Sequence, residues 1–304
     1  VSWSTDEAMS IYAGDSTTLQ WNLIAEPLNY SYHFETGDTD FERHGYGGIW
    51  GGQHLSAHHN LFAHCNSRTP RFNGARAGIP ELVDYRNNVI YNWGGNNVYA
   101  GEGGRYNVIN NYYKPGPSTG KRIRHRFLNP YKGENIPFGE FYFAGNEVEG
   151  FPDVAKDNAK GVEWHEAKND EIDRYRLQTP IEVEPVSTQS ASNAFQLVLT
   201  AAGASFRRDT LDARIIEDVR KGRGQLIDVQ GGFAHGTPYD LTVNAWPDLK
   251  SSTPLPDTDR DGMPDAWEKE NGLDPNDPTD AGKKGNHDFY TAIERYIHSI
   301  TGAR

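Results

Sequence analysis

The chain has 304 residues, of which 36% are hydrophobic and 12% aromatic, and it contains 32 glycines. This composition suits an all-β protein with many tight turns, and it disfavours a helical bundle, which needs long aliphatic stripes. The net charge of −12 argues against nucleic acid as a general partner, and no apolar run approaches the roughly 20 residues of a membrane span. The single cysteine, Cys65, excludes an intrachain disulfide framework and is expected to fill a core position.

Residues 1 to about 150 contain short segments of alternating or continuous apolar character that end in Asn-rich turns. The asparagines that align at these turns are separated by 38, 28, 23 and 35 residues, and they are Asn22, Asn60, Asn88, Asn111 and Asn146. A repeated unit with insertions of variable length is typical of a solenoid. Asparagine tolerates left-handed backbone geometry, and stacked amides can hydrogen-bond from coil to coil. The Asn-rich loops of an ordinary sandwich are the alternative that this pattern leaves open.

The pattern of apolar residues changes after about residue 150. Residues 150–185 are charged and irregular, whereas residues 194–199 and 211–219 have the periodicity of two helices, with Asp209 as a candidate N-cap. We therefore predict a solenoid body at residues 1–250, whose tail occupies about 151–250, and a separate module at 254–304.

Residues 257–268 match the template of an EF-hand calcium loop. The predicted Ca²⁺ ligands, of which Met263 would use its backbone carbonyl, are Asp257, Asp259, Asp261, Met263, Asp265 and Glu268. A Pro-rich linker rather than a helix precedes the loop, so the module resembles a dockerin or a thrombospondin type 3 repeat more than a paired EF-hand. We predict a structural calcium clip that orders the tail through a helix at 287–300.

Four segments resemble polysaccharide lyase family 1, the pectate lyases. They are VSWSTDEAMSIYAG at residues 1–14, the long stretch at 44–72 that contains His58-His59-Asn60 and Arg68-Thr69-Pro70-Arg71, LVDYRNNVIYNWG, and AAGASFRRDTLDARIIEDVRKGRG, which looks like the tail of bacterial members. The resemblance spans roughly residues 1 to 235. It implies a right-handed parallel β-helix, and it implies that family coils preceding Val1 are absent here, as in a fragment or a lyase completed by a separate chain.

The resemblance also implies a reaction and its base. Arg68 occupies the position of the Brønsted base that removes the C5 proton of a uronate. Because arginine is normally protonated, such a base needs a neighbouring cation and alkaline conditions. A groove Ca²⁺ would neutralise the substrate carboxylate, and Asp6 and Glu7 are its expected ligands, since Ser10 stands where the family has a second acid.

Substrate binding is expected from residues around the base. Tyr46 stands where the family has a lysine, so His44 and Tyr46 are candidate hydrogen-bonding substitutes. Arg71 is a candidate fork for a substrate carboxylate, and Arg76 is a candidate replacement for a family arginine whose position is taken by Asn73. Trp50, Trp93 and Tyr99 are candidates for stacking on sugars, with interior packing as the alternative.

The leading hypothesis is a secreted, periplasmic or cell-surface pectate lyase that cleaves polygalacturonate by Ca²⁺-assisted β-elimination. Two alternatives stay open, a pectin lyase acting on methylated substrate and a non-catalytic β-helix that binds acidic cell-wall polysaccharide. The retained Arg68 favours an enzyme, while the replaced lysine and acid favour a binding protein.

Overall fold

The computed structural model describes residues 1–31, 33–285 and 289–301. The chain divides into two compact units, one formed by 1–204 with 208–247 and the other by 248–304 with 205–207. Among the described residues, no helix is both long and apolar enough to cross a membrane.

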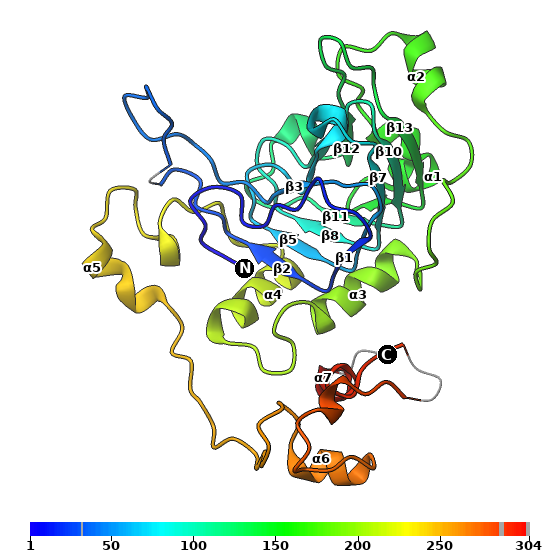
Figure 1. Cartoon of the computed structure of the whole chain (residues 1–304). Helices are drawn as coiled ribbons and strands as arrows, with labels where there is room; N and C mark the ends of the chain where they lie inside the picture. The colour runs from blue at the N-terminus through cyan, green and yellow to red at the C-terminus, as the bar shows by residue number, and fades with distance from the viewer. Residues whose placement is uncertain (32, 286–288, 302–304) are drawn as a thin grey trace. The chain divides into compact units, whose positions relative to one another are not determined.

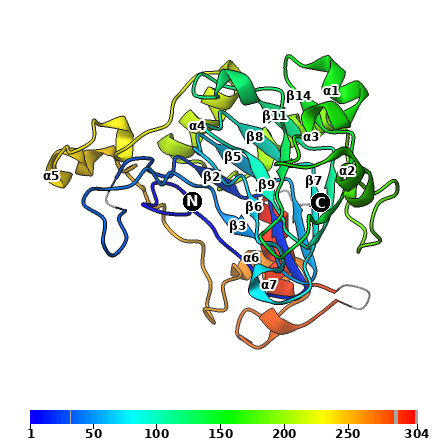
Figure 2. The same ribbon diagram turned by 90° about the horizontal axis from the view of Figure 1, so that it is seen from above.

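The first unit consists of three parallel sheets that the chain visits in a fixed rotation (Figures 1 and 2). The first sheet contains β1 (Thr17–Gln20), β4 (Leu55–His58), β7 (Leu82–Arg86), β10 (Arg105–Ile109) and β13 (Glu140–Ala144). The second contains β2 (Leu23–Ala25), β5 (Leu61–Ala63), β8 (Val89–Tyr91), β11 (Tyr112–Lys114) and β14 (Glu147–Val148). The third contains β3 (Ile49–Trp50), β6 (Arg71–Phe72), β9 (Val98–Ala100) and β12 (Leu128–Pro130). This rotation fits the predicted parallel β-helix.

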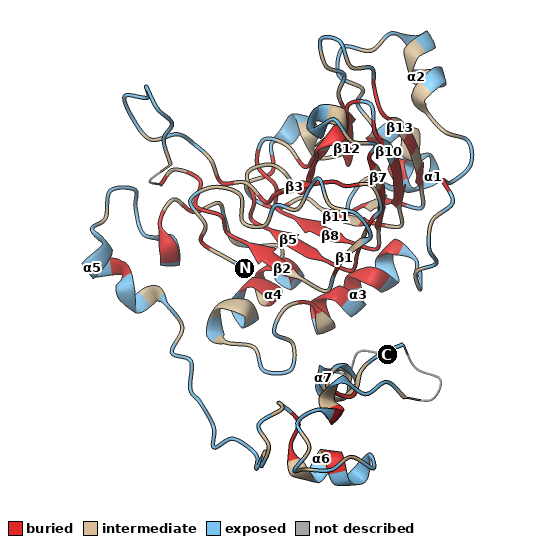
Figure 3. Cartoon of the chain, viewed as in Figure 1, coloured by how far each residue is buried: buried red, intermediate tan, exposed pale blue. Residues whose placement is uncertain are grey.

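Apolar side chains from all three sheets form one core cluster, and the strands are coloured mostly as buried in Figure 3. Phe72, Tyr106 and Phe141 come from three neighbouring coils, and their rings stack with centroid separations of 4.5 and 4.6 Å. Cys65 is buried as predicted, and burial raises the pKa of its thiol. Trp50 and Trp93 are fully buried in the same core, so the interior interpretation of these two tryptophans is correct.

The predicted asparagine ladder is confirmed. Each ladder side chain donates from its Nδ2 to the Oδ1 of the next, through Asn22, Asn60, Asn88, Asn111 and Asn146, at 2.8–3.1 Å, and Asn158 adds a further rung. The expectation about backbone geometry was wrong by one residue. The left-handed conformation lies just before each ladder asparagine, at Trp21, His59, Asn87, Asn110 and Gly145. From Asn60 to Asn146 the ladder residue itself is fully buried, and its amide both donates and accepts hydrogen bonds.

Helices α3 (Ala191–Ala201) and α4 (Thr210–Lys221) cover the outer face of the second sheet. The side chains of Leu23, Leu61 and Val89 pack against them, which explains why short strands of this sheet are buried on both faces. The predicted N-cap is confirmed, because the Asp209 carboxylate accepts a hydrogen bond from the backbone N–H of Asp212 at 2.8 Å.

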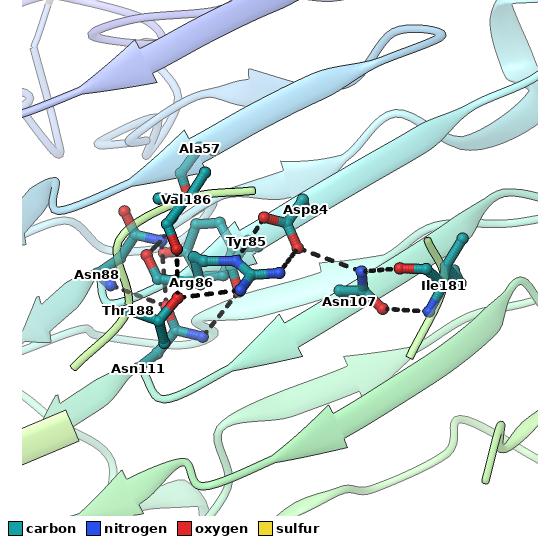
Figure 4. A network of polar contacts seen from close by, with 10 residues as sticks. All are labelled: Ala57, Asp84, Tyr85, Arg86, Asn88, Asn107, Asn111, Ile181, Val186 and Thr188. Atoms are coloured by element: carbon teal, nitrogen blue, oxygen red, sulfur yellow. Dashed lines mark hydrogen bonds and ion pairs between the residues drawn. The ribbon is translucent and has the colours of Figure 1, made fainter. Parts of the chain in front are cut away.

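The segment before α3 is held on the first sheet by hydrogen bonds from an asparagine and an arginine side chain (Figure 4). Asn107 on β10 exchanges two hydrogen bonds of 2.9 Å with the backbone of Ile181. Arg86 on β7 donates to Thr188 at 3.1 Å, and it forms an ion pair with Asp84. Segment 181–188 therefore lies along the sheet although it has no regular structure of its own.

The remaining helices are short. In the first unit they are α1 (Pro152–Lys156), α2 (Asn169–Tyr175) and α5 (Tyr239–Thr242), with 3₁₀ turns at Gly74–Ala77, Lys121–Ile123, Asn158–Gly161, Gln230–Gly232 and Val243–Ala245. The second unit contains α6 (Asp265–Glu270), a 3₁₀ turn η6 (Asp280–Gly282) and α7 (Ala292–Thr301). The helix predicted at 287–300 thus begins at Ala292, and residues 287 and 288 lie outside the described residues.

Candidate functional site

Three chain segments that are far apart in the sequence lie side by side beneath the predicted catalytic arginine. The backbone N–H of Ala8 donates to Tyr46 O at 3.0 Å, and that of Gly47 donates to Ser67 O at 2.9 Å. The N–H of Gly48 continues the ladder to Arg68 O at 2.7 Å. Parallel hydrogen bonding between successive coils therefore brings residues near 7, 46 and 68 together.

Two glycines allow this close approach. A Cβ at Gly47 would lie 2.3 Å from Arg68 O, and a Cβ at Gly48 would lie 1.8 Å from Met9 O. Both contacts involve backbone atoms, which cannot move aside without breaking the ladder. The two glycines after Tyr46 are therefore required by the packing of three coils.

Arg68 has a left-handed backbone, with φ of 59°, and its side chain is 21% exposed. Its guanidinium forms an ion pair with the carboxylate of Glu7, and it lies over the ring of Tyr46 with its Cζ 4.2 Å from the ring centroid. The Nε of Arg68 is buried without a hydrogen-bond partner. The guanidinium is thus held between an acid and an aromatic face, with part of its surface accessible.

Asp6 and Glu7 point to different partners. The Asp6 carboxylate contacts Nε2 of His44 at 2.9 Å, whereas Glu7 contacts Arg68. His33 stacks on His44 with the ring centroids 3.9 Å apart, and Asp6, His33 and His44 offer ligand atoms within 4.8 Å of one another. Burial lowers the pKa of His44 despite the opposing effect of Asp6, and burial raises the pKa of Tyr46. Neutral His44 and neutral Tyr46 are therefore the forms near pH 7.

Two of the three positions where this chain departs from the pectate lyase pattern, Ser10 and Asn73, have structural roles. The Ser10 hydroxyl accepts a hydrogen bond from Ile49 N at 2.9 Å, and it thereby supports the neighbouring coil. Asn73 is buried, and its amide donates to Gly74 O at 3.3 Å. Neither side chain supplies a charge to the surroundings of Arg68.

Arg71 lies in a different environment from the one expected of a substrate-binding fork. Its Nη2 contacts both carboxylate oxygens of Glu102, at 2.9 and 3.2 Å, and each of these two side chains is only 9% exposed. The Arg71 guanidinium also donates to the backbone carbonyl of Phe72 at 2.8 Å. In this arrangement the fork binds a protein carboxylate, so a structural role is favoured over contact with substrate.

Arg76 lies on the exposed 3₁₀ turn Gly74–Ala77, and within the described part of the chain it makes no ion pair. Tyr99 is partly exposed on β9, with its ring 5.9 Å from the Cζ of Arg71. Tyr99 thus remains available for stacking on a sugar, unlike the two buried tryptophans.

A hollow of about 770 Å³ lies elsewhere in the first unit. It is lined by residues of β1, β4 and β7 and by segment 182–185, including Thr17, Ser56, Asp84 and Glu184. None of the residues predicted to act in catalysis or binding lines it.

In the second unit, the structure gathers most of the predicted calcium ligands. Asp257, Asp259 and Asp261 offer oxygens within 4.8 Å of one another, and Asp261 forms a similar group with Glu268 and Asp280. Burial and the neighbouring carboxylates, Asp259 first among them, raise the pKa of Glu268 to about 7. Asp265 belongs to neither of these sets, and both of its oxygens accept hydrogen bonds from Thr258.

Comparison with known proteins shows similarity to fungal proteins over nearly the whole chain. The chain is 31% identical over 310 residues to "Probable pectate lyase C" of Aspergillus fumigatus, a match that covers 99% of this chain and 63% of the fungal protein. It is 31% identical over 315 residues to the protein of the same name from Aspergillus terreus, with 99% and 64% coverage, and 30% identical over 312 residues to that of Neosartorya fischeri, with 99% and 63%.

The chain thus spans a little under two thirds of the length of these relatives. No family model matches it. Because the match covers 99% of the chain, it includes the second unit as well as the coils. The named relatives are fungal, so they give no support to a bacterial affinity or to the comparison with dockerins and thrombospondin repeats.

Sequence reasoning missed three acidic or imidazole groups, namely His33, Glu102 and Asp280. Each lies outside the motif to which its partner belongs, and a sequence does not report contacts between distant loops. For Asp280 there was one indication, because it belongs to an Asp-rich stretch, Asp274-Pro-Asn-Asp-Pro-Thr-Asp280, directly after the calcium loop.

Proposed function

We propose that this chain acts as a pectate lyase, which cleaves α-1,4-linked polygalacturonate by Ca²⁺-assisted β-elimination and releases 4,5-unsaturated oligogalacturonides. The observation that carries the proposal is the position of Arg68, partly exposed and brought beside Glu7 and Tyr46 by three adjacent segments. The similarity to fungal proteins named as probable pectate lyases supports the same activity. Since the substrate is an extracellular polymer, we also propose that the protein acts outside the cell.

In the proposed reaction, Arg68 in its neutral form accepts the C5 proton of a galacturonate. The electron pair of the C5–H bond forms the C4–C5 double bond, and the C4–O bond to the next sugar breaks. The departing glycosidic oxygen then takes a proton from solvent. Neutral Tyr46 lies beside Arg68, and neutral His44 lies beside Tyr46, so both are candidates to hydrogen-bond sugar hydroxyls.

Asp6 and Glu7 are the carboxylates that would hold Ca²⁺ near the base, since calcium prefers such oxygen ligands. When bound, the ion supplies positive charge that offsets the substrate carboxylate as its α-carbon loses a proton. Glu7 already contacts the Arg68 guanidinium, so the ion and Arg68 compete for one carboxylate. Withdrawing Glu7 from Arg68 removes the negative charge that favours a protonated guanidinium.

A specific observation also favours a second candidate function, binding of acidic polysaccharide without cleavage. In the structure Arg68 is paired with Glu7 and Asp6 with His44, so that neither carboxylate is free of a partner. If these pairs persist when the polymer binds, Arg68 attracts the polyanion but accepts no proton from it.

The two candidates differ in a direct assay. The ultraviolet absorbance of the double bond conjugated to the carboxylate is followed during incubation with polygalacturonate at alkaline pH, with Ca²⁺ or with excess chelator. The lyase predicts a chelator-sensitive rise that Arg68→Ala abolishes. Arg105→Ala is the matched control, because Arg105 is an exposed arginine that pairs with Glu140 on the first sheet. A protein that binds the polymer with no rise on low- or high-ester pectin is a binding protein, and activity that survives in Arg68→Ala overturns the assignment of the base.

A further inference from the structure

In the second unit, several carboxylate oxygens are buried without any hydrogen-bond partner. They are Asp259 Oδ2, Asp261 Oδ2, both Oε atoms of Glu268, and Asp280 Oδ1. Glu268 is 0% and Asp280 1% exposed. An unpaired buried carboxylate costs several kcal/mol, and the same charge on four neighbouring side chains adds repulsion. These oxygens therefore indicate a cation as their missing partner.

The other oxygens of these carboxylates fix the direction of the free ones. Asp259 Oδ1 accepts from Asp261 N at 3.3 Å, and Asp261 Oδ1 accepts from Met263 N at 2.8 Å. Asp280 Oδ2 accepts from Asp274 N at 2.9 Å, which leaves Oδ1 free. Each aspartate thus uses one oxygen to shape its own loop and turns the other toward its neighbours.

The free oxygens belong to one connected group. Asp257, Asp259 and Asp261 have ligand atoms within 4.8 Å of one another, and Asp261, Glu268 and Asp280 form a second such set. Asp261 belongs to both sets and thereby connects them. Among the described residues, Asp280 forms its ion pair with Lys283, whose Nζ lies 3.9 Å from Asp280 Oδ2, the oxygen that accepts from Asp274, and 3.1 Å from Asp277 Oδ2.

The ninth loop position, Asp265, belongs to neither set, whereas Asp257 belongs to the first set although its oxygens also accept from Arg260 N and Gly262 N. The oxygens of Asp265 accept hydrogen bonds from Thr258 N at 2.7 Å and from Thr258 Oγ1 at 2.9 Å. Asp265 thereby ties the beginning of the loop to the first turn of α6. The oxygen that an EF-hand loop takes from its own ninth residue has to come from elsewhere.

We propose that Asp280 is a direct ligand of a Ca²⁺ ion bound by the 257–268 loop, where it replaces Asp265 and joins the loop to segment 274–283. The remaining ligands are Asp257, Asp259, Asp261 and Glu268, with the Met263 carbonyl. A site built entirely of oxygens, from five carboxylates and one carbonyl, suits Ca²⁺ better than Mg²⁺ or Zn²⁺. The ion then crosslinks two parts of the unit that the sequence separates by twelve residues, Glu268 and Asp280.

The proposal is tested on the whole chain by calcium titration calorimetry and by thermal unfolding with Ca²⁺ and with chelator. The variants are Asp280→Asn, Asp265→Asn as the matched control, and Glu268→Gln as the reference for a disabled site. Asp280→Asn keeps an oxygen that can accept from Asp274, and Asp265→Asn keeps one that can accept from Thr258. We expect Asp280→Asn to weaken calcium binding at this site at least tenfold and Asp265→Asn to change it less than threefold.

Thermal unfolding supplies a second test. The shift in unfolding temperature caused by Asp280→Asn should differ in sign between chelator and Ca²⁺, which a purely structural role would not produce. Because Asp280→Asn removes a charge from a crowded acidic group, the transition of this unit should occur at an equal or higher temperature in chelator and at a lower temperature in Ca²⁺, relative to the unchanged protein. Calcium affinity of Asp280→Asn equal to that of the unchanged protein overturns the proposal. So does an equal loss of thermal stability with and without Ca²⁺, since Asp280 would then act only through Asp274.

Discussion

The carboxylate of Glu7 and the guanidinium of Arg68 form an ion pair across the chain segment that carries Tyr46. The guanidinium also lies over the Tyr46 ring, with its Cζ 4.2 Å from the ring centroid. A ligand that takes the Glu7 oxygen paired with Arg68 displaces the guanidinium, and withdrawal of Glu7 favours the neutral form of Arg68. This single contact couples the proposed base to the proposed calcium ligand.

Replacement of Glu7 tests that coupling. Glu7→Gln removes one of the two carboxylates expected to hold Ca²⁺, so the Ca²⁺ concentration for half-maximal lyase activity should rise about tenfold, which corresponds to about 1.4 kcal/mol. Activity at saturating Ca²⁺ should be retained in part, because Arg68 no longer faces a negative charge. The measurement is the initial rate of absorbance increase over a Ca²⁺ series. An unchanged Ca²⁺ dependence would show that Glu7 does not bind the ion.

The buried pair of Arg71 and Glu102 is expected to support the fold. Arg71→Ala leaves Glu102 buried without its cation, and it should lower the free energy of unfolding by about 3–5 kcal/mol. The double variant Arg71→Met with Glu102→Met should lose much less, because both charges are removed together. Urea unfolding measures the free energy of unfolding of the single and of the double variant. If Arg71→Ala unfolds like the unchanged protein but has a strongly raised KM for polygalacturonate, the substrate fork is the correct role.

Substitution of a ladder asparagine should destabilise the protein most in the middle of the ladder. Asn88 is fully buried, accepts from Asn60 and donates to Asn111 and Ala57 O, so Asn88→Ala leaves several buried groups without partners. We expect a loss of about 2–4 kcal/mol in unfolding free energy, given 1–3 kcal/mol for each orphaned group. Asn22→Ala is the control at the half-exposed end of the ladder, and it should cost less than about 1.5 kcal/mol. Equal losses of unfolding free energy at both positions would contradict the expectation that burial and the number of lost partners set the cost.

Buried histidines should make the protein less stable in mild acid. Burial, assisted by His59, lowers the pKa of His58 to about 4, and burial also lowers the pKa of His59 and His64. Between pH 6.5 and 4 the unfolded chain therefore binds more protons at His58 than the folded protein does, and stability falls as the pH falls through this window. The contribution of His58 is at most about 1.4 kcal/mol for each pH unit.

The check is the unfolding temperature measured from pH 7 to pH 4, for the protein and for His58→Gln. Burial raises the pKa of Glu81, which acts in the opposite direction, so the informative quantity is the difference between the two curves. The curves should diverge above pH 5, where the unchanged protein is the more stable, and converge as the pH approaches 4. A constant difference across the whole range would show that His58 does not change protonation on unfolding.

Features that depend on periodicity or on neighbouring residues were predictable from the sequence. The asparagine spacing predicted coils stacked through side-chain amides, and Asp209 predicted the start of α4, because ladders and caps use contacts that recur at fixed intervals or lie within one turn. The Asp-rich loop predicted the candidate ligands Asp257, Asp259 and Asp261 for the same local reason.

Contacts between segments separated by many residues were decided only by the tertiary structure. The sequence by itself determined that Arg71 and Asp280 carry charges suited to a ligand. The packing of coils decided that Arg71 meets Glu102 in a buried pair, and the folding of the second unit decided that Asp280, and not Asp265, turns an unpartnered oxygen toward Glu268. A charge reveals which partners a side chain can have, but burial and distance select one of them, and both depend on loops that the local sequence does not place.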